Sequence, residues 1–117
     1  MVKKVSSIND ISQTLKLLGD KTRLTIIKLL EQRECCVCEL VEVLQISQPA
    51  VSQHLRKIKD TGLIKEKRKG QWIFYSLNPE FEQWDMVQDL FKHVPSQEHL
   101  LMELEQKSLL NCCEKDC

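Results

Sequence analysis

Six cysteines in a chain of 117 residues are the side chains with the clearest chemistry, and they fall into two clusters. The clusters are Cys35, Cys36 and Cys38, and Cys112, Cys113 and Cys117. In a reducing compartment, clustered thiols are ligands for soft ions or reactive groups more often than a disulfide framework. Thiolates without nearby histidine prefer thiophilic guests such as Cd, Pb, Hg, Cu(I) or trivalent arsenic and antimony.

The first cluster lies where a helix is expected to begin, because apolar residues recur at helical spacing from Val37 to Leu44. A helix N-terminus favours thiolates through its dipole and its unpaired N–H groups. On such a helix, Cys36 and Cys38 would flank the apolar stripe and Cys35 would point away from the core. Residues two apart do not share a helix face, so Cys36 and Cys38 can hold one ion only where the helix starts late or unwinds.

The elements that must position these thiols are mainly helical. Helices are predicted over 8–18, 21–32, 37–44 and 48–60, then a hairpin with strands 63–68 and 71–77, then a helix from about 81 that breaks at Pro95 and resumes over 96–110. Asp20 and Ser47 are predicted N-caps, and Thr61 and Gly62 end the fourth helix. The expected fold class is mainly α with a small β-hairpin, in the order α-α-α-α-β-β-α-α.

The composition fits one small domain. Charged residues make up 29% and hydrophobic residues 42% of the chain, with three glycines and three prolines, which is typical of a helix-rich globular protein. We expect a single domain over 1–110 followed by a cysteine-containing tail over 111–117. No stretch resembles a membrane span or a secretory signal, so the expected location is the cytoplasm.

Basic residues concentrate in one segment although the whole chain has a net charge of zero. Between His54 and Trp72 there are seven lysines or arginines against Asp60 and Glu66. Local positive charge of this kind suits a phosphate backbone, so the segment indicates binding to nucleic acid.

The helices 37–44 and 48–60, joined by about three residues, form a predicted helix-turn-helix. Any amphipathic helix has a polar outer face, but here a hairpin with a basic tip follows at once, which defines a winged helix. Gln and Arg side chains can read base edges, and Ser and Lys can hold phosphates. The candidate DNA-binding residues are Gln48, Ser52, Gln53, Arg56, Lys57, Lys67, Arg68, Lys69 and Gln71. His54 flanks the buried stripe and is expected to pack or hydrogen-bond rather than contact a base.

Three segments together carry a resemblance to a known family. They are ECCVCEL at 34–40, SQPAVSQHL at 47–55 and KGQWIFYSL at 69–77. With LGDKTRL at 18–24, they resemble the ArsR/SmtB family of winged-helix metalloregulatory repressors over about residues 15–77. The similarity is to the arsenical-responsive branch in particular, whose signature is Glu-Leu-Cys-Val-Cys-Asp-Leu-Cys.

Against that signature, Cys36 and Cys38 take the places of the two central cysteines, and Val41 stands at the third. The third sulfur would come from Cys35 or from the terminal cluster, of the same chain or of a partner subunit. Alternatively, the terminal cluster would form a separate three-sulfur site or be redox-active. Cadmium and lead sensors of the family share Cys-Val-Cys but add N-terminal cysteines, and none precedes Cys35.

The resemblance implies a homodimeric repressor that binds operator DNA and is released when As(III) or Sb(III) binds cysteine thiolates. Members of the family dimerise through their first and last helices, so the candidate seam residues are Leu15, Leu18, Leu101 and Leu104. A Cd- or Pb-responsive repressor and a thiol-redox-responsive repressor of the same fold are the open alternatives. An enzyme is not expected, because no anion-binding loop accompanies the thiols and no histidine is placed as a base.

Overall fold

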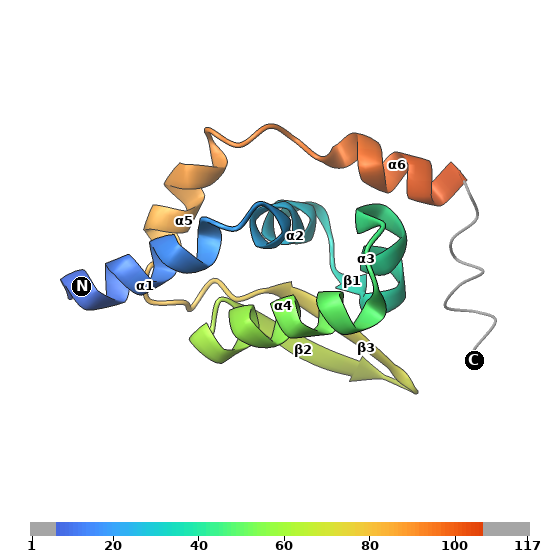
Figure 1. Ribbon diagram of the computed structural model, residues 1–117, viewed down its shortest axis with the longest axis horizontal. Helices are drawn as coiled ribbons and strands as arrows, with labels where there is room; N and C mark the ends of the chain where they lie inside the picture. The colour runs from blue at the N-terminus through green and yellow to red at the C-terminus, as the bar shows by residue number, and fades with distance from the viewer. Residues whose placement is uncertain (1–6, 107–117) are drawn as a thin grey trace.

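The computed structural model describes residues 7–106, which form six helices and a three-stranded antiparallel sheet (Figure 1). The elements are α1 (Ile8–Leu18), α2 (Lys21–Gln32), β1 (Cys35–Cys36), α3 (Val37–Leu44), α4 (Gln48–Thr61), β2 (Ile64–Lys69), β3 (Trp72–Leu77), α5 (Trp84–Phe91) and α6 (Glu98–Gln106). The molecule measures 47 × 29 × 27 Å. In Figure 1, α2 lies in the middle, α4 runs along the β2–β3 hairpin below it, and α5 and α6 continue over the opposite side.

Local capping explains why the helices begin where the sequence predicts. Ser7, Asp20 and Ser47 each accept the backbone N–H of the residue three positions on, at 3.1, 3.0 and 3.3 Å. Gly62 ends α4 with φ 91°, a left-handed conformation that glycine adopts without strain. The predicted bounds of the first four helices are confirmed, with α4 one residue longer than expected.

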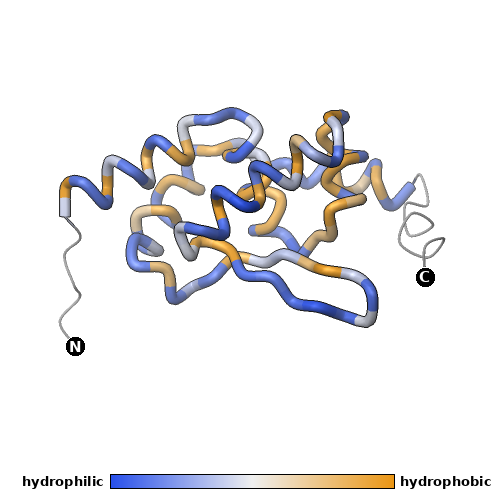
Figure 2. Tube along the Cα trace, turned by 60° about the horizontal axis from the view of Figure 1, so that its bottom comes forward, coloured by the Kyte–Doolittle hydropathy of each residue, from blue (hydrophilic) through white to orange (hydrophobic). Residues whose placement is uncertain are grey.

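The hydrophobic core is built around α2. Ile26 and Leu29 are completely buried, and α4 contributes the predicted stripe of Val51, Leu55 and Ile58. Figure 2 shows β2 as mainly hydrophilic, and its residues after the buried Ile64 are exposed, whereas β3 mixes hydrophobic residues with weakly polar ones and is half-buried throughout. The hairpin therefore packs on the core through β3 and the start of β2, while the rest of β2 lies in solvent.

The sheet contains a strand that the sequence pattern did not predict. β1 pairs antiparallel with β3, with Cys35 opposite Tyr75 and Cys36 opposite Phe74, and the strand order is β1-β3-β2. Two residues are too short a run to show alternation, which is why the periodicity gave no sign of β1. The hairpin turn falls at Gly70 (φ 64°) and Gln71, one residue later than predicted.

The candidate dimer seam requires correction. Leu18, Leu101 and Leu104 are buried within the single chain, so they pack on its own core, and of the four only Leu15 is exposed.

α6 begins at Glu98 rather than at 96. The end predicted for it at 110, and the tail over 111–117, lie outside the described residues. None of the helices in residues 7–106 is long and apolar enough to cross a membrane.

Candidate thiol site and nucleic-acid interface

The backbone at the start of α3 brings two sulfur atoms together. Cys36 is extended, with φ −94° and ψ 168°, and is the N-cap of α3, so the helix begins at Val37. The Sγ atoms of Cys36 and Cys38 lie 3.2 Å apart, well beyond the roughly 2.05 Å of a disulfide bond. The late helix start that a shared ion requires is therefore present.

Glu39 fixes this conformation, a role that the sequence analysis did not assign to it. One carboxylate oxygen accepts the backbone N–H of Cys36 at 3.0 Å, and the other accepts Arg33 Nη2 at 2.9 Å. Glu39 is buried, so the ion pair with Arg33 is shielded from solvent on that side. The signal was available, because a glutamate three residues after an N-cap is the spacing of a capping box.

Replacing Glu39 with alanine is expected to lower the free energy of unfolding by about 1–3 kcal/mol, because Arg33 and the Cys36 N–H both lose a buried acceptor. Urea denaturation measures this change. Glu42→Ala on the same helix is the matched control and should change stability by less than about 0.5 kcal/mol. Equal effects of the two substitutions would contradict the anchoring role of Glu39.

Cys35 lies apart from the pair. Its thiol is completely buried and donates to the Arg33 carbonyl at 3.6 Å. The prediction that Cys35 points away from the core is wrong, because it lies in a strand rather than in a helix, and neighbouring strand residues face opposite sides. Burial raises the pKa of the Cys35 thiol to about 12, and the Glu39 carboxylate adds to the shift.

The folded protein is expected to resist alkylation of Cys35 by iodoacetamide at pH 8, because the reaction needs the thiolate and burial keeps the thiol protonated. Peptide mass spectrometry before and after unfolding in urea measures the label. The same shift should destabilise the fold as pH rises from about 9 toward 12, since the unfolded thiol, with an ordinary pKa of 9.0, ionises first. Labelling of folded and unfolded Cys35 at equal rates would contradict the burial.

Within residues 7–106, no group of three histidine, cysteine or acidic side chains is assembled for a metal ion. The structure thus brings together Cys36 and Cys38 of the predicted ligands and separates Cys35 from them. The remaining predicted ligands lie outside the described residues; they are Cys112, Cys113 and Cys117.

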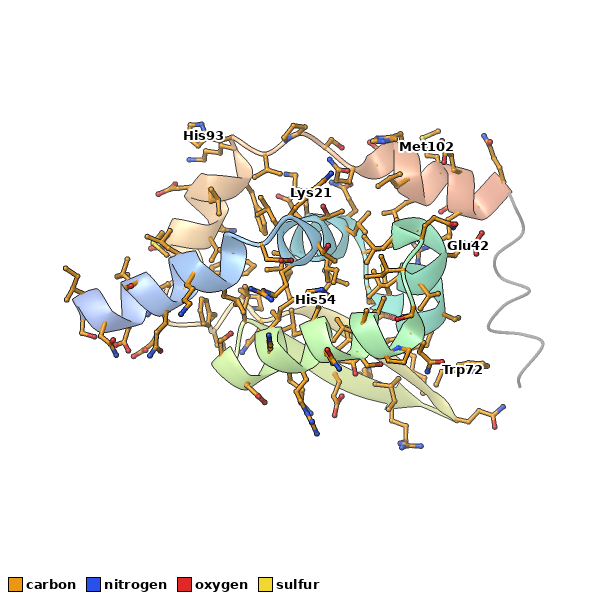
Figure 3. The ribbon with its side chains drawn as sticks, in the orientation of Figure 1. Lys21, Glu42, His54, Trp72, His93 and Met102 are labelled. Carbon is orange, nitrogen blue, oxygen red and sulfur yellow. The ribbon has the colours of Figure 1, made fainter. Side chains whose placement is uncertain are left out.

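A cavity of about 390 Å³ adjoins the cysteine pair and connects it with the predicted DNA-binding surface. Its lining residues are Cys36, Val37, Cys38, Val41, Glu42, Gln48, Gln71, Trp72 and Ile73. Figure 3 places Trp72 beside the start of α4, and Trp72 lines the cavity together with the first residues of α3. The pair therefore shares one cavity with the first residue of α4 and with the turn of the hairpin.

All nine predicted DNA-binding side chains are exposed, five on α4 and four on or beside the hairpin. A groove of about 490 Å³ separates α4 from the hairpin, and its walls include Ser52, Gln53 and Arg56. Across this groove Lys59 pairs with Glu66 at 2.7 Å, which holds the hairpin against α4. This ion pair keeps the pKa of the Glu66 carboxyl below its usual value.

Two other contacts position the surface. His54 of α4 lies 3.4 Å from Arg23 Nη1 and 4.0 Å from Asp20, so it has the hydrogen-bonding surroundings predicted for it and ties α4 to the start of α2. Lys69 pairs with Glu34 and lies 4.9 Å from the centre of the Phe74 ring. Glu34, which directly precedes the first cysteine cluster, is thus paired electrostatically with the tip of the hairpin.

The fold is that of a winged-helix transcriptional regulator. Residues 20–66 match the family described as bacterial regulatory protein, arsR family. The solved structure of reduced HlyU from Vibrio cholerae is similar, with a TM-score of 0.64 and 32% identity, covering 72% of this chain and 87% of that one.

Two regulators of arsenic resistance are also similar in sequence. The arsenic resistance transcriptional regulator ArsR1 of Pseudomonas putida is 44% identical over 70 residues, or 59% of this chain, and the match spans just 55% of that relative. The arsenical resistance operon repressor of Staphylococcus aureus is 37% identical over 84 residues, covering 72% of this chain and 80% of the relative. The chain belongs to the ArsR family. The relatives are regulators of transcription and not enzymes.

Proposed function

We propose that this protein is a transcriptional repressor that binds operator DNA as a homodimer and releases it when trivalent arsenic or antimony binds Cys36 and Cys38. The observation that carries the proposal is the 3.2 Å approach of the two sulfurs at a cavity that also contains Gln48, the first residue of α4. Such a repressor would act in the cytoplasm, where thiols stay reduced and available to a soft ion.

The DNA-binding half of the proposal rests on the exposed face of α4 and on the hairpin as its wing. Gln48, Gln53 and Arg56 lie on the exposed face of α4 and have the paired donors and acceptors that read base edges in a major groove. Lys67 and Arg68 on the wing are exposed and suit the phosphates beside that groove. In a homodimer, two such helices would meet successive major grooves of a partly symmetric site.

The separation of the two sulfurs favours a pyramidal guest. With sulfur bonds of about 2.3 Å, as thiolates make to zinc, sulfurs 3.2 Å apart subtend roughly 90° at the bound atom. That angle suits trivalent arsenic or antimony, whose lone pair compresses the bonds, better than a tetrahedral ion. Cadmium or zinc would also require further ligands, and the described residues assemble no third one.

Two structural connections support a coupling of this site to the DNA-binding surface. α3 and the start of α4 line one cavity, and β1 pairs with β3 of the wing directly at Cys36. A metalloid that binds the DNA-free conformer more tightly than the DNA-bound conformer must lower the affinity for DNA by linkage. A typical coupling free energy lowers that affinity by a factor of roughly 5 to 150. The metalloid would thereby allow transcription.

The test is the binding of labelled promoter DNA, followed by fluorescence anisotropy under a phosphine reductant. Arsenite, antimonite, cadmium, lead and zinc are titrated separately. Release by the metalloids at lower concentrations than by the metal ions supports the proposal, and no specific DNA binding at all would overturn it.

Thiol oxidation is a second candidate, because the 3.2 Å approach also permits a disulfide after a small movement. A parallel titration with hydrogen peroxide, with the reductant removed, separates the two functions. Release by peroxide without any metalloid, together with no response to arsenite, would favour the redox function.

Lys67→Ala is expected to weaken binding to all DNA sequences alike and to reduce the salt slope of binding by about 1, because the wing lysine would contact phosphate rather than a base. Anisotropy titrations at several salt concentrations measure the slope. Lys92→Ala, which replaces another exposed lysine, at the end of α5, is the matched control and should leave the slope unchanged. A loss confined to one DNA sequence would contradict the phosphate contact.

A further inference from the structure

The cavity beside the cysteine pair has mainly apolar walls. Val37 and Val41 of α3 line it from one side, and Trp72 and Ile73 of β3 line it from another. Its volume of about 390 Å³ falls within the roughly 300–1,000 Å³ typical of small-molecule sites. Trivalent arsenic without a carbon substituent, As(OH)₃, would fill little of this mainly apolar cavity.

The residue of α3 that could have supplied a third ligand beside the cysteine pair is a valine, Val41. Val41 lies one helical turn after Cys38 and lines the same cavity, so its side chain lies on the side of α3 that faces the guest. Cys35 is buried in the core instead, with its thiol on the Arg33 carbonyl. The described part of the chain therefore offers a guest two sulfurs and an apolar surface.

We propose that the preferred inducer is trivalent arsenic that already carries one carbon substituent, of the form R–As(OH)₂, with the sulfurs of Cys36 and Cys38 on arsenic and the substituent in the cavity against Val41 and Trp72. The inference rests on the proposed function and specifies the chemical class of its inducer. Two sulfurs and one carbon complete the pyramid around arsenic, so no third sulfur is needed.

The binding step is balanced without any redox partner. Two As–S bonds form and two As–O bonds break, while the two thiol protons leave with the two hydroxyl groups as water. Arsenic remains trivalent and the As–C bond is unchanged. A larger substituent gains more by leaving water for the cavity, so phenylarsenous acid should bind more tightly than methylarsonous acid.

The experiment uses the full chain and a variant of it in which serine replaces Cys112, Cys113 and Cys117. Calorimetric titrations under a phosphine reductant compare phenylarsenous acid with arsenite. Both proteins are expected to bind one phenylarsenous acid per chain with dissociation constants within threefold of each other. The serine variant should bind arsenite at least tenfold more weakly than phenylarsenous acid. Equal affinities for the two compounds in that variant would overturn the inference.

Two substitutions at Val41 in the serine variant test the geometry in opposite directions. Val41→Cys supplies a third sulfur and should tighten arsenite binding at least tenfold. Val41→Phe fills the cavity, so it should weaken the binding of phenylarsenous acid at least tenfold and change the binding of arsenite less than threefold. Because Val41 also packs on the core, Trp72→Ala is a second test, with an expected loss of at least fivefold for phenylarsenous acid. Equal changes for both compounds in these variants would contradict the placement of the substituent.

The outcomes separate this inference from the function on which it rests. If neither compound releases promoter DNA through Cys36 and Cys38, the proposed function fails. If both release it through that pair and are equally potent, the proposed function stands and the preference for an organic substituent is wrong.

Discussion

A variant with serine in place of both Cys36 and Cys38 is expected to bind promoter DNA within threefold of the wild-type affinity and to stay bound when metalloid is added. Serine is close in size to cysteine and is a good N-cap, so the start of α3 should survive the change. The guest, however, loses both sulfurs. The metalloid-induced drop in DNA affinity, roughly 5- to 150-fold in the wild type, should fall below twofold.

Anisotropy with and without saturating arsenite or phenylarsenous acid measures this change. Cys35→Ala is the control, because it removes a thiol that is buried apart from the pair, and it should keep the response. A full response in the double-serine variant would place the sensor at the terminal cysteines and overturn the assignment of the site.

Arg56→Ala is expected to weaken binding to the specific operator by about 1–3 kcal/mol, or roughly 5- to 150-fold, with a smaller loss on unrelated DNA. Arg56 is exposed in the middle of α4 and lines the groove between α4 and the wing. A guanidinium there can hold a guanine edge through two hydrogen bonds, and its loss should relax the base preference at one position. Competition titrations with operator variants changed at single base pairs measure that preference.

Arg56→Lys gives the finer comparison. Lysine keeps the charge but not the planar pair of donors, so a base contact predicts a large loss and a phosphate contact predicts a small one. Equal losses on specific and unrelated DNA in Arg56→Ala would contradict a base-reading role for this residue.

Local signals were enough to predict most of the fold. Ser47 caps the start of α4, and Gly62 ends the helix with a left-handed turn. The stripe of Val51, Leu55 and Ile58 determines which face of α4 is buried. These features depend on residues at most one helical turn apart, so periodicity and capping rules locate them. The α4 candidates Ser52, Gln53, Arg56 and Lys57 follow from the same stripe, since they occupy the other side of the helix. The candidates on the hairpin follow instead from its basic tip.

Contacts across the chain could not be predicted in this way. The burial of Cys35 depends on the pairing of β1 with Tyr75 and Phe74, which lie about forty residues further on. The cavity likewise joins Cys38 to Trp72 only because the hairpin folds back beside α3. α3 does begin late, at Val37, which is the condition set for a shared ion, whereas the expected direction of Cys35 is wrong because no local pattern reveals a two-residue strand.

A closed thermodynamic cycle on the reduced protein measures the coupling between metalloid binding and operator binding. One side measures the operator affinity of the free and the metalloid-saturated protein, and the other measures metalloid affinity of the free and the operator-bound protein. Linkage requires the two ratios to be equal, and we expect a common factor between about 5 and 150 in the wild type and near 1 in the Cys36→Ser, Cys38→Ser variant. Equal metalloid affinities of the free and the operator-bound protein would show that the cysteine pair does not control operator binding, because such binding cannot release DNA.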